Sequence, residues 1–462
     1  MLRRLIALTV AAMLILGYHP GLEDDAYYLA AIKQRLNPAL FPHDADFFRL
    51  QFQATLFDRL ISASVRLTHL PLDWAALIWQ FAAVFVILAA CRRIADHCFD
   101  EEQARWAAVG LVAALLTIPV SGTGIALVDQ HLHPRNLATA AILWAVAATL
   151  ERRLAIAALL LAVAASLHVI MAAFGVSLCL FLGYRGGMQV AALLLPLGWL
   201  FEPTTAAWRK AAATRTFYYP ARWEWYEWLG VLAPMAILWF FGRFGRRVAS
   251  FAVFQLVVAL VMILPPGLER LRPLEPMRYL QLVYVLMFLL IGGAIGKHLL
   301  KRTAWRWAVL FAPLSLGMLY AQLDLYPATS HFEWPGVPSS NRWVRAFTWI
   351  RANTPVDSYF ALNPQYMALS GEDYHGFRGL AERSALADNL KDPGMVARVP
   401  RLAERWQTES EAQNGWQHFK SADFRRLKAN FGVNWVVVEN PAVSDLDCPY
   451  RDGDLRVCRV ND

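Results

Sequence analysis

Three consecutive carboxylates, Glu23, Asp24 and Asp25, follow a short apolar segment near the N-terminus. Acidic side chains are costly beside lipid, and those that occur there tend to be functional. A carboxylate in this position can act as a general base on a hydroxyl group, or it can bind a divalent cation such as Mg²⁺ or Mn²⁺. We therefore take Asp25 and Asp24 as candidate catalytic bases and Glu23 as a candidate metal ligand. The alternative is structural, because negative charge at the start of a helix over residues 26–36 stabilises that helix.

A second polar cluster, in a loop between two apolar segments, contains Asp129, His131, His133 and Arg135. Aspartate and histidine side chains are metal ligands, and a guanidinium group can pair with a phosphate. His131 and His133 are two residues apart, so they share a face only in an extended loop. The cluster predicts either a binding site, with Asp129 and His131 for a metal and His133 and Arg135 for an anion, or a loop that caps the following helix.

Two isolated polar residues border other apolar segments. His168 separates two short ones, where it is either a binding residue or a histidine with ordinary core or interfacial contacts. Arg278 begins an apolar segment at the end opposite to most of the basic residues. Its planar guanidinium suits a lipid-linked phosphate. The alternative is a side chain that reaches toward lipid headgroups.

The composition indicates that membrane-spanning helices hold these residues. Of 462 residues, 57% are hydrophobic and 17% are charged, whereas soluble proteins carry about 25% charged residues. The mean hydropathy is +0.35. Windowed hydropathy predicts about eleven membrane spans, near residues 3–18, 74–91, 104–120, 136–150, 154–168, 169–183, 188–200, 226–242, 248–264, 278–296 and 303–320. The first is expected to be an uncleaved helix, because no convincing small-residue cleavage site follows it.

Basic residues predict the orientation of these spans. If the N-terminus is cytoplasmic, the basic groups of every inner loop are cytoplasmic as well, as the positive-inside rule requires; they are Arg3, Arg4, Arg92, Arg93, Arg152, Arg153, Arg185, Arg243, Arg246, Arg247, Lys297, Lys301 and Arg302. An odd number of spans then places the C-terminal part outside the cytoplasm. The net charge of +8 reflects this topology, and since no nucleic-acid-binding motif is present we expect no nucleic acid partner.

The sequence therefore predicts a polytopic α-helical membrane domain over residues 1–322 and a small extracytoplasmic α/β domain over residues 323–462. The first outer loop, residues 19–72, contains two segments with helical periodicity, 26–36 and 47–70. We expect both to be short amphipathic helices that lie on the membrane surface.

The C-terminal domain has the patterns of alternating helices and strands. Turn and capping signals predict helices over 341–353 and 423–430 and strands over 358–362 and 433–438. The pair Asp452-Gly453 is a hairpin signal, which would bring Cys448 and Cys458 opposite each other. Outside the cytoplasm a disulfide between these two cysteines is expected.

Together these features resemble the GT-C superfamily of membrane glycosyltransferases. In that family a first helix precedes a long outer loop with an acidic motif and two surface helices; about a dozen spans and often an extracytoplasmic domain follow. Here Glu23-Asp24-Asp25-Ala-Tyr-Tyr-Leu stands where the family has its acidic motif. The stretches 349–355 and 377–384 also look like those of uncharacterised bacterial members. The acidic motif differs from the well-characterised variants, so metal dependence and the identity of the acting carboxylate stay open.

The resemblance implies a sugar donor linked to polyprenyl phosphate and a glycan, lipid or protein acceptor at the outer face of a bacterial cytoplasmic membrane. Asp25 or Asp24 would be the base, and Arg278 would hold the donor phosphate. Further binding contacts would come from Arg135, His133, His168, Arg270 and Arg272.

Two other classes of function compete with this interpretation. A transporter or flippase of a lipid-linked or anionic substrate needs polar groups at the membrane midplane and often has internal repeats, and the sequence shows neither. A non-catalytic membrane assembly protein would not need the acidic motif. The sequence contains no nucleotide-binding loop, nucleophile elbow or zinc-protease helix.

Overall fold

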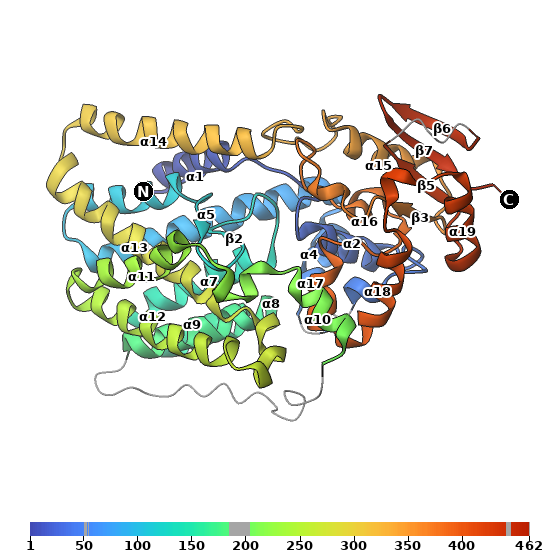
Figure 1. Ribbon diagram of the computed structural model, residues 1–462. Coiled ribbons are helices and arrows are strands. Elements are labelled where there is room, and N and C mark those ends of the chain that lie inside the picture. The colour runs from blue at the N-terminus through green and yellow to red at the C-terminus, as the bar shows by residue number, and fades with distance from the viewer. Residues whose placement is uncertain (50–52, 54, 184–203, 440–444, 462) are drawn as a thin grey trace. The chain divides into compact units, whose positions relative to one another are not determined.

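The computed structural model describes residues 1–49, 53, 55–183, 204–439 and 445–461, most of which are helical (Figure 1). The chain divides into two compact units. Unit 1 comprises Met1–Gly17, Leu77–Pro203 and Thr216–Gln322, and unit 2 comprises Tyr18–Ala76, Thr204–Arg215 and Leu323–Asp462. The outer loop predicted over 19–72 thus folds with the C-terminal part, while the predicted domain boundary at 322–323 coincides with a boundary between the units.

Unit 1 is built from apolar helices that follow one another along the chain. They are α1 (Leu2–Leu16), most of α5 (Leu72–Cys98), α6 (Glu102–Ala114), α7 (Pro134–Leu150), α8 (Leu154–Leu167), α9 (Val169–Gly183), α11 (Trp225–Trp239), α12 (Gly242–Ile263), α13 (Leu280–Ile295) and α14 (Ala304–Leu325). Each predicted span in the described part of the chain overlaps one of these helices. The span predicted at 188–200 lies outside the described residues.

Length and hydropathy single out four helical stretches of the described residues as able to cross a membrane. These are Leu72–Cys98, Gly242–Ile263, Pro276–Leu300 and Ala304–Leu325. Two shorter apolar helices, α8 and α9, accompany them. The chain therefore has the helices of a multi-pass membrane protein, and the total of eleven spans stays a prediction.

The helices of unit 1 differ greatly in how far they are covered. In the stretch Pro276–Leu300, which contains α13, 78% of the most apolar part is buried, whereas in α14 the share is 6%. Glycines let α13 approach α6 closely, since a Cβ atom added at Gly292 would lie 2.6 Å from the carbonyl oxygen of Ala107. Small residues have this role at many helix contacts in membranes. α13 is thus a central helix of unit 1, and α14 is a peripheral one.

The segment 26–36 forms α2 (Asp25–Leu36), but the prediction that it lies on the membrane surface is wrong. Its residues from Asp25 to Lys33 are buried in unit 2, where α2 packs on α16 (Phe377–Ala381). A Cβ atom added at Gly376 would lie 2.1 Å from the Cβ of Ala26, so the two segments meet without a side chain between them. The helical periodicity of 26–36 predicts a helix, as observed, but α16, the element that covers this helix, lies about 350 residues away in the chain.

The segment 47–70 is divided between two helices, α3 (Asp46–Arg49) and α4 (Phe57–Thr68). α4 is amphipathic and buries Phe57 and Ile61. α10 (Ala206–Ala213), from the middle of the chain, also belongs to unit 2 and packs on α17 (Asp392–Arg398) and α18 (Ala403–Ala412). Unit 2 therefore combines three separate parts of the sequence.

The C-terminal part of unit 2 contains a mixed sheet in the strand order β4-β3-β5-β7-β6. β3 (Tyr359–Leu362) pairs in parallel with β4 (Ser384–Ala385) and β5 (Trp435–Val438), and β7 (Leu455–Arg459) pairs antiparallel with β5 and β6 (Asp447–Asp452). The predicted hairpin is β6–β7, and Cys448 and Cys458 form a disulfide across it. The small α/β domain expected from the sequence is present.

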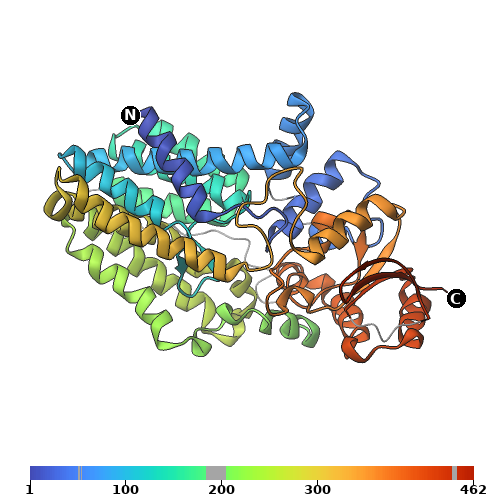
Figure 2. The same ribbon diagram turned by 90° about the horizontal axis from the view of Figure 1, so that it is seen from above.

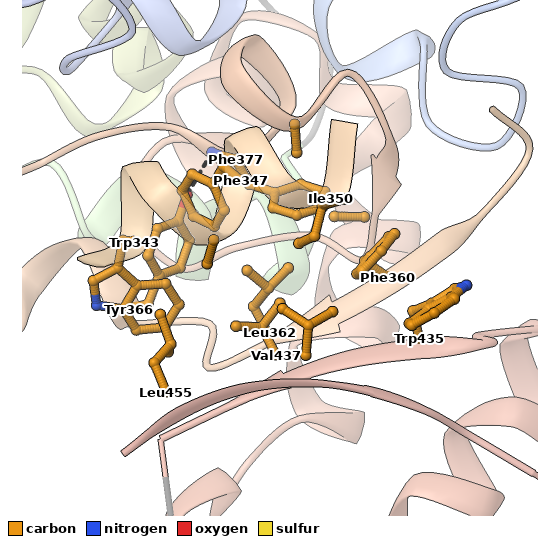
Figure 3. Close-up of a cluster of buried hydrophobic side chains, with 14 of the residues drawn as sticks. Trp343, Phe347, Ile350, Phe360, Leu362, Tyr366, Phe377, Trp435, Val437 and Leu455 are labelled. Atoms are coloured by element: carbon orange, nitrogen blue, oxygen red, sulfur yellow. Dashed lines mark hydrogen bonds between the residues drawn. The ribbon is translucent and has the colours of Figure 1, made fainter. Parts of the chain in front are cut away.

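Alternate side chains of the strands point to opposite faces of the sheet, and each face has its own hydrophobic cluster. Phe360 of β3 packs with Trp343 and Phe347 of α15 (Arg342–Asn353), and Figure 3 shows this cluster. On the other face, Val436 of β5 packs with Phe424 of α19 (Ser421–Phe431). In Figure 2 the orange α15 and the red α19 lie on opposite sides of the sheet. The domain therefore has a helix–sheet–helix core.

We expect Phe347→Ala to destabilise unit 2 by about 3–5 kcal/mol, the usual cost of removing a buried aromatic ring. The Phe347 ring is fully buried and meets the rings of Tyr366 and Phe377 at 5.8 and 5.2 Å. Urea unfolding of the full-length protein in detergent, followed by tryptophan fluorescence, measures the change. Val356→Ala is the matched control, because this side chain is exposed and should cost less than about 0.5 kcal/mol. Equal effects of the two substitutions would contradict the described core.

Candidate active site

Residues Gly21–Asp25, which we call the carboxylate turn, form a tight loop at the start of α2 in unit 2. Gly21 and Glu23 adopt positive φ angles of 79° and 54°. The Gly376 N–H donates to the Gly21 carbonyl oxygen at 2.8 Å, and the Glu23 N–H donates to the carbonyl oxygen of Tyr374 at 2.9 Å. These backbone bonds fix the turn on the segment that leads into α16, so the directions of its carboxylates are set by the fold.

Asp25 is the buried member of this turn, with 6% of its surface exposed. The Gly21 N–H donates to its Oδ2 atom at 2.6 Å. Burial raises the pKa of Asp25 to about 7, although the Gly21 hydrogen bond and the charges of Lys33 and His375 act in the opposite direction. A carboxylate with a pKa near 7 can accept a proton at neutral pH and release it again. Asp25 thus has the protonation behaviour of a general base.

Glu23 and Asp24 are the accessible members, with side chains 40% and 37% exposed. Both form ion pairs with the ammonium group of Lys391, whose Nζ lies 3.3 Å from Asp24 Oδ1. Burial lowers the pKa of Lys391, but the two carboxylates outweigh that effect and raise it. Lys391 therefore stays charged and holds Glu23 and Asp24 on one side of the turn.

The carboxylate of Glu333 contacts two histidines next to the carboxylate turn. Glu333 Oε1 is 3.1 Å from His19 Nδ1 and 3.0 Å from His375 Nε2. Burial alone would raise the pKa of Glu333, but the charges and hydrogen bonds of the two histidines bring it down to about 2. His19 precedes the turn, and the backbone of His375 forms an antiparallel bridge with Leu22 of the turn. The cluster therefore connects both sides of the turn to the segment around Glu333.

A further ion cluster holds α2 against α17. The Arg378 guanidinium forms two hydrogen bonds with Asp392, at 2.8 and 3.0 Å, and also pairs with Asp44. The Tyr27 hydroxyl donates to Asp392 at 3.3 Å. These groups are buried, and two carboxylates around one guanidinium satisfy much of its hydrogen-bonding capacity. The cluster fixes the helix that carries Asp25.

In unit 1, the loop with Asp129, His131, His133 and Arg135 is buried. Arg135 pairs with Asp129, and its backbone N–H donates to His133 Nδ1 at 3.0 Å, so that His133 caps α7. Gln80 of α5 donates to the Asp129 carbonyl oxygen at 2.6 Å. These contacts agree with the capping interpretation that the sequence offered as an alternative.

Arg278 lies in a short helical segment, Pro276–Tyr279, that precedes α13 in unit 1. It is buried and forms an ion pair with Glu275 at 2.6 Å. The two residues line a small cavity of about 10 Å³ together with Arg272. The Arg272 guanidinium covers the ring of Tyr219 at 4.8 Å. Two guanidinium groups thus border one small cavity, and Glu275 pairs with the guanidinium of Arg278.

His168 lies between α8 and α9 and is half-buried. Its Nδ1 accepts a hydrogen bond from the Met171 N–H at 3.3 Å, at the start of α9. This contact joins the two helices, as expected of a histidine with ordinary interfacial contacts.

The structure therefore places the predicted site residues in separate local groups. Glu23, Asp24 and Asp25 lie together in unit 2, whereas the remaining binding candidates belong to unit 1. No group of three His, Cys, Asp or Glu side chains that could hold a metal ion occurs among the described residues. The sequence does not predict the roles of Lys391, Glu333, His19 and His375. Their ion pairs join residues that are distant in the chain, so the sequence shows that these residues are charged or titratable but not which of them meet.

The chain resembles the crystal structure of the oligosaccharyltransferase of Archaeoglobus fulgidus in the apo form, with a TM-score of 0.48 and 12% sequence identity, over 95% of this chain and 69% of that chain. No protein-family model matches the sequence, and no curated protein matches it.

The raised pKa of Asp25 predicts a specific pH dependence of stability. The folded protein binds a proton more tightly at this carboxyl than the unfolded chain does, because the pKa rises from 3.8 to about 7 on folding. Stability from this group is therefore complete below about pH 4 and is lost as the pH rises to about 7. A difference of one in pKa corresponds to about 1.4 kcal/mol, so the total loss amounts to a few kcal/mol.

Asp25→Asn removes the titrating proton but keeps an oxygen that can accept the Gly21 N–H bond. Urea unfolding between pH 4 and pH 8 should show wild type losing stability relative to Asp25→Asn as the pH rises. Asp46→Asn, an exposed control in α3, should follow wild type. A constant difference between wild type and Asp25→Asn over this range would show that Asp25 has an ordinary pKa.

Proposed function

We propose that this chain is a membrane glycosyltransferase of the GT-C type, with Asp25 as the general base that activates the acceptor hydroxyl. The donor in this proposal is a sugar on polyprenyl phosphate, and the acceptor is a hydroxyl group of a glycan, lipid or protein at the outer membrane face. The observation that carries the proposal is the buried carboxylate of Asp25, which has a pKa of about 7 within a turn fixed by backbone hydrogen bonds.

The reaction requires one proton acceptor and one stabilised leaving group. The acceptor oxygen forms a bond to the anomeric carbon of the sugar while its proton passes to the Asp25 carboxylate. The bond between the anomeric carbon and the phosphate oxygen breaks, and the electron pair leaves with the lipid phosphate. A base with a pKa near the working pH serves this step best, and nearby cations stabilise the departing phosphate.

For the donor phosphate we propose Arg278 and Arg272, two guanidinium groups that border a cavity of about 10 Å³. Because a cavity of this size holds about one water molecule, a phosphate would bind there only after Glu275 moves away from Arg278. A guanidinium fork matches phosphate oxygens. Arg278 is held by Glu275, so a phosphate would take over part of the interaction that this carboxylate now provides. His133, Arg135 and His168 already have structural contacts in unit 1, which gives them a supporting role in this proposal.

The accessible pair Glu23 and Asp24 offers the place for a divalent cation if the reaction uses one. Carboxylate oxygens are suitable ligands for Mg²⁺ or Mn²⁺. Here both carboxylates pair with Lys391, so a cation would compete with the ammonium group. In the proposal, the role of Asp24 is to orient the acceptor beside Asp25.

The test is sugar transfer by the purified full-length protein in membrane vesicles that contain a polyprenyl-phosphate sugar. We expect Asp25→Asn to reduce the rate by about 100-fold or more, the scale of general base catalysis, while Asp46→Asn keeps the wild-type rate. The wild-type rate should rise with pH up to about 7 and then level off, since the base acts only when deprotonated. Wild-type transfer by a stably folded Asp25→Asn variant would exclude Asp25 as the base, whereas a lack of transfer by the wild-type protein would favour a transporter or an assembly protein.

A second prediction concerns the donor site. Replacing Arg278 alone would leave Glu275 buried without its partner, which typically costs about 3–5 kcal/mol. The double variant Glu275→Gln/Arg278→Gln removes both charges together and should fold, but it should lose transfer by about 100-fold or more because the phosphate charge is no longer balanced. Glu275→Gln alone keeps the guanidinium and should remain active. Equal transfer rates of the double and the single variant would exclude Arg278 from donor binding.

A further inference from the structure

A large apolar groove lies along the peripheral helix α14 in unit 1. Its volume is about 900 Å³, within the range of about 300–1,000 Å³ that ligand sites occupy. Three helices form it: α1, α6 and α14. The side chains along its length include Ala7, Ala11, Ile15, Gly110, Ala113 and Phe311.

The groove exists because α14 stands apart from its neighbours. Only 6% of the most apolar window of α14 is buried. The Phe311 ring of α14 reaches α6 at Gly110, where an added Cβ atom would lie 3.2 Å from the ring. Elsewhere small side chains of α1 and α6 leave the space open. In a bilayer, an apolar space of this kind contains lipid tails, because neither water nor exposed backbone is stable there.

One end of the groove carries an excess of positive charge. Arg4, Lys301 and Arg302 line it there, together with the carboxylate of Glu102. Glu102 forms an ion pair with Arg4 at 3.7 Å and also accepts hydrogen bonds from Arg92 and from the Trp106 indole, so the excess charge is that of Lys301 and Arg302. In the described part of the chain, neither Lys301 nor Arg302 has a carboxylate partner. This end is therefore complementary to an anionic group.

The length of the groove matches one leaflet. Along α1, the distance from Arg4 at the charged end to Ile15 is about 16 Å at 1.5 Å per residue. The hydrocarbon core of a bilayer is about 30 Å thick, so the apolar wall spans about half of it. The same basic residues are those that the sequence predicts to be cytoplasmic. An amphiphile with its head at Lys301 and its tail beside Ile15 would lie in one leaflet in the ordinary orientation.

We propose that this groove binds one anionic phospholipid, with its headgroup phosphate at Arg4, Lys301 and Arg302 and an acyl chain along α1 and α6. The site is structural or regulatory, and it fixes the position of α14, which has few protein contacts of its own. The proposal is independent of the proposed transferase activity, because its recognition groups lie in unit 1 and its test requires no sugar transfer.

The experiment uses the full-length protein in nanodiscs of equal parts phosphatidylglycerol and phosphatidylcholine, followed by native mass spectrometry of the lipids that remain bound after transfer to detergent. Wild type should retain about one phosphatidylglycerol in preference to phosphatidylcholine. Lys301→Gln/Arg302→Gln should reduce that preference about tenfold or more, because each basic side chain near an anionic head adds to binding. The matched control Arg243→Gln/Arg246→Gln removes two exposed arginines outside the groove and should leave the preference unchanged.

A second pair of variants tests the apolar part. Ala11→Phe fills the groove and should release the bound lipid, whereas Val10→Phe, at an exposed neighbouring position on α1 that does not line the groove, should retain it. Equal retention of the two lipids by wild type, or an unchanged preference in Lys301→Gln/Arg302→Gln, would overturn the proposal. The result for Lys301→Gln/Arg302→Gln decides the question even if Ala11→Phe fails to fold. Lys301 and Arg302 are exposed, so their replacement should leave the fold intact.

Discussion

The burial of a single carboxylate, that of Asp25, is the constraint around which the carboxylate turn is organised. Removing a charged carboxyl from water is costly unless hydrogen bonds and opposite charges compensate. Here the Gly21 N–H, Lys33 and His375 offset only part of that cost, which leaves a carboxyl that is protonated up to about pH 7. A turn of this shape needs the positive φ of Gly21 and the close approach of Gly376 to α2, so the burial of Asp25 depends on two glycines.

Other buried charges in the two units are balanced much more fully. Arg378 has Asp392 and Asp44, Lys391 has Glu23 and Asp24, and Arg278 has Glu275. Breaking such a pair on one side is strongly destabilising, which indicates that these charges mainly hold structure in the absence of substrate. Asp25 accepts its hydrogen bond from the Gly21 backbone N–H, whereas Asp392, whose pKa burial also raises, is paired with a guanidinium. The groove along α14 differs from these ion pairs, because there the protein's own contacts leave an apolar space that an amphiphile can fill.

Much of the architecture could be predicted from hydropathy and local signals. The apolar spans, the helix 342–353, the buried strand β5 and the hairpin with its disulfide all depend on patterns within short segments. The placement of α2 could not be predicted, because its helical periodicity does not reveal that α16, far along the chain, covers it. Lys391, Glu333 and His375 were missed for the same reason. The neutralisation of Arg278 was visible in principle, since Glu275 stands three residues earlier, at a spacing where helical side chains meet.

The most direct test of the central claim is a measurement of Asp25 protonation itself. Infrared difference spectra of wild type against Asp25→Asn, recorded on the full-length protein over a pH series, isolate the carbonyl band of this one protonated carboxyl. The account predicts that the band disappears with a midpoint near pH 7, the pKa set by burial. A midpoint near 3.8, the ordinary value, would show that Asp25 is an ionised cap of the turn and would remove the base from the proposed reaction.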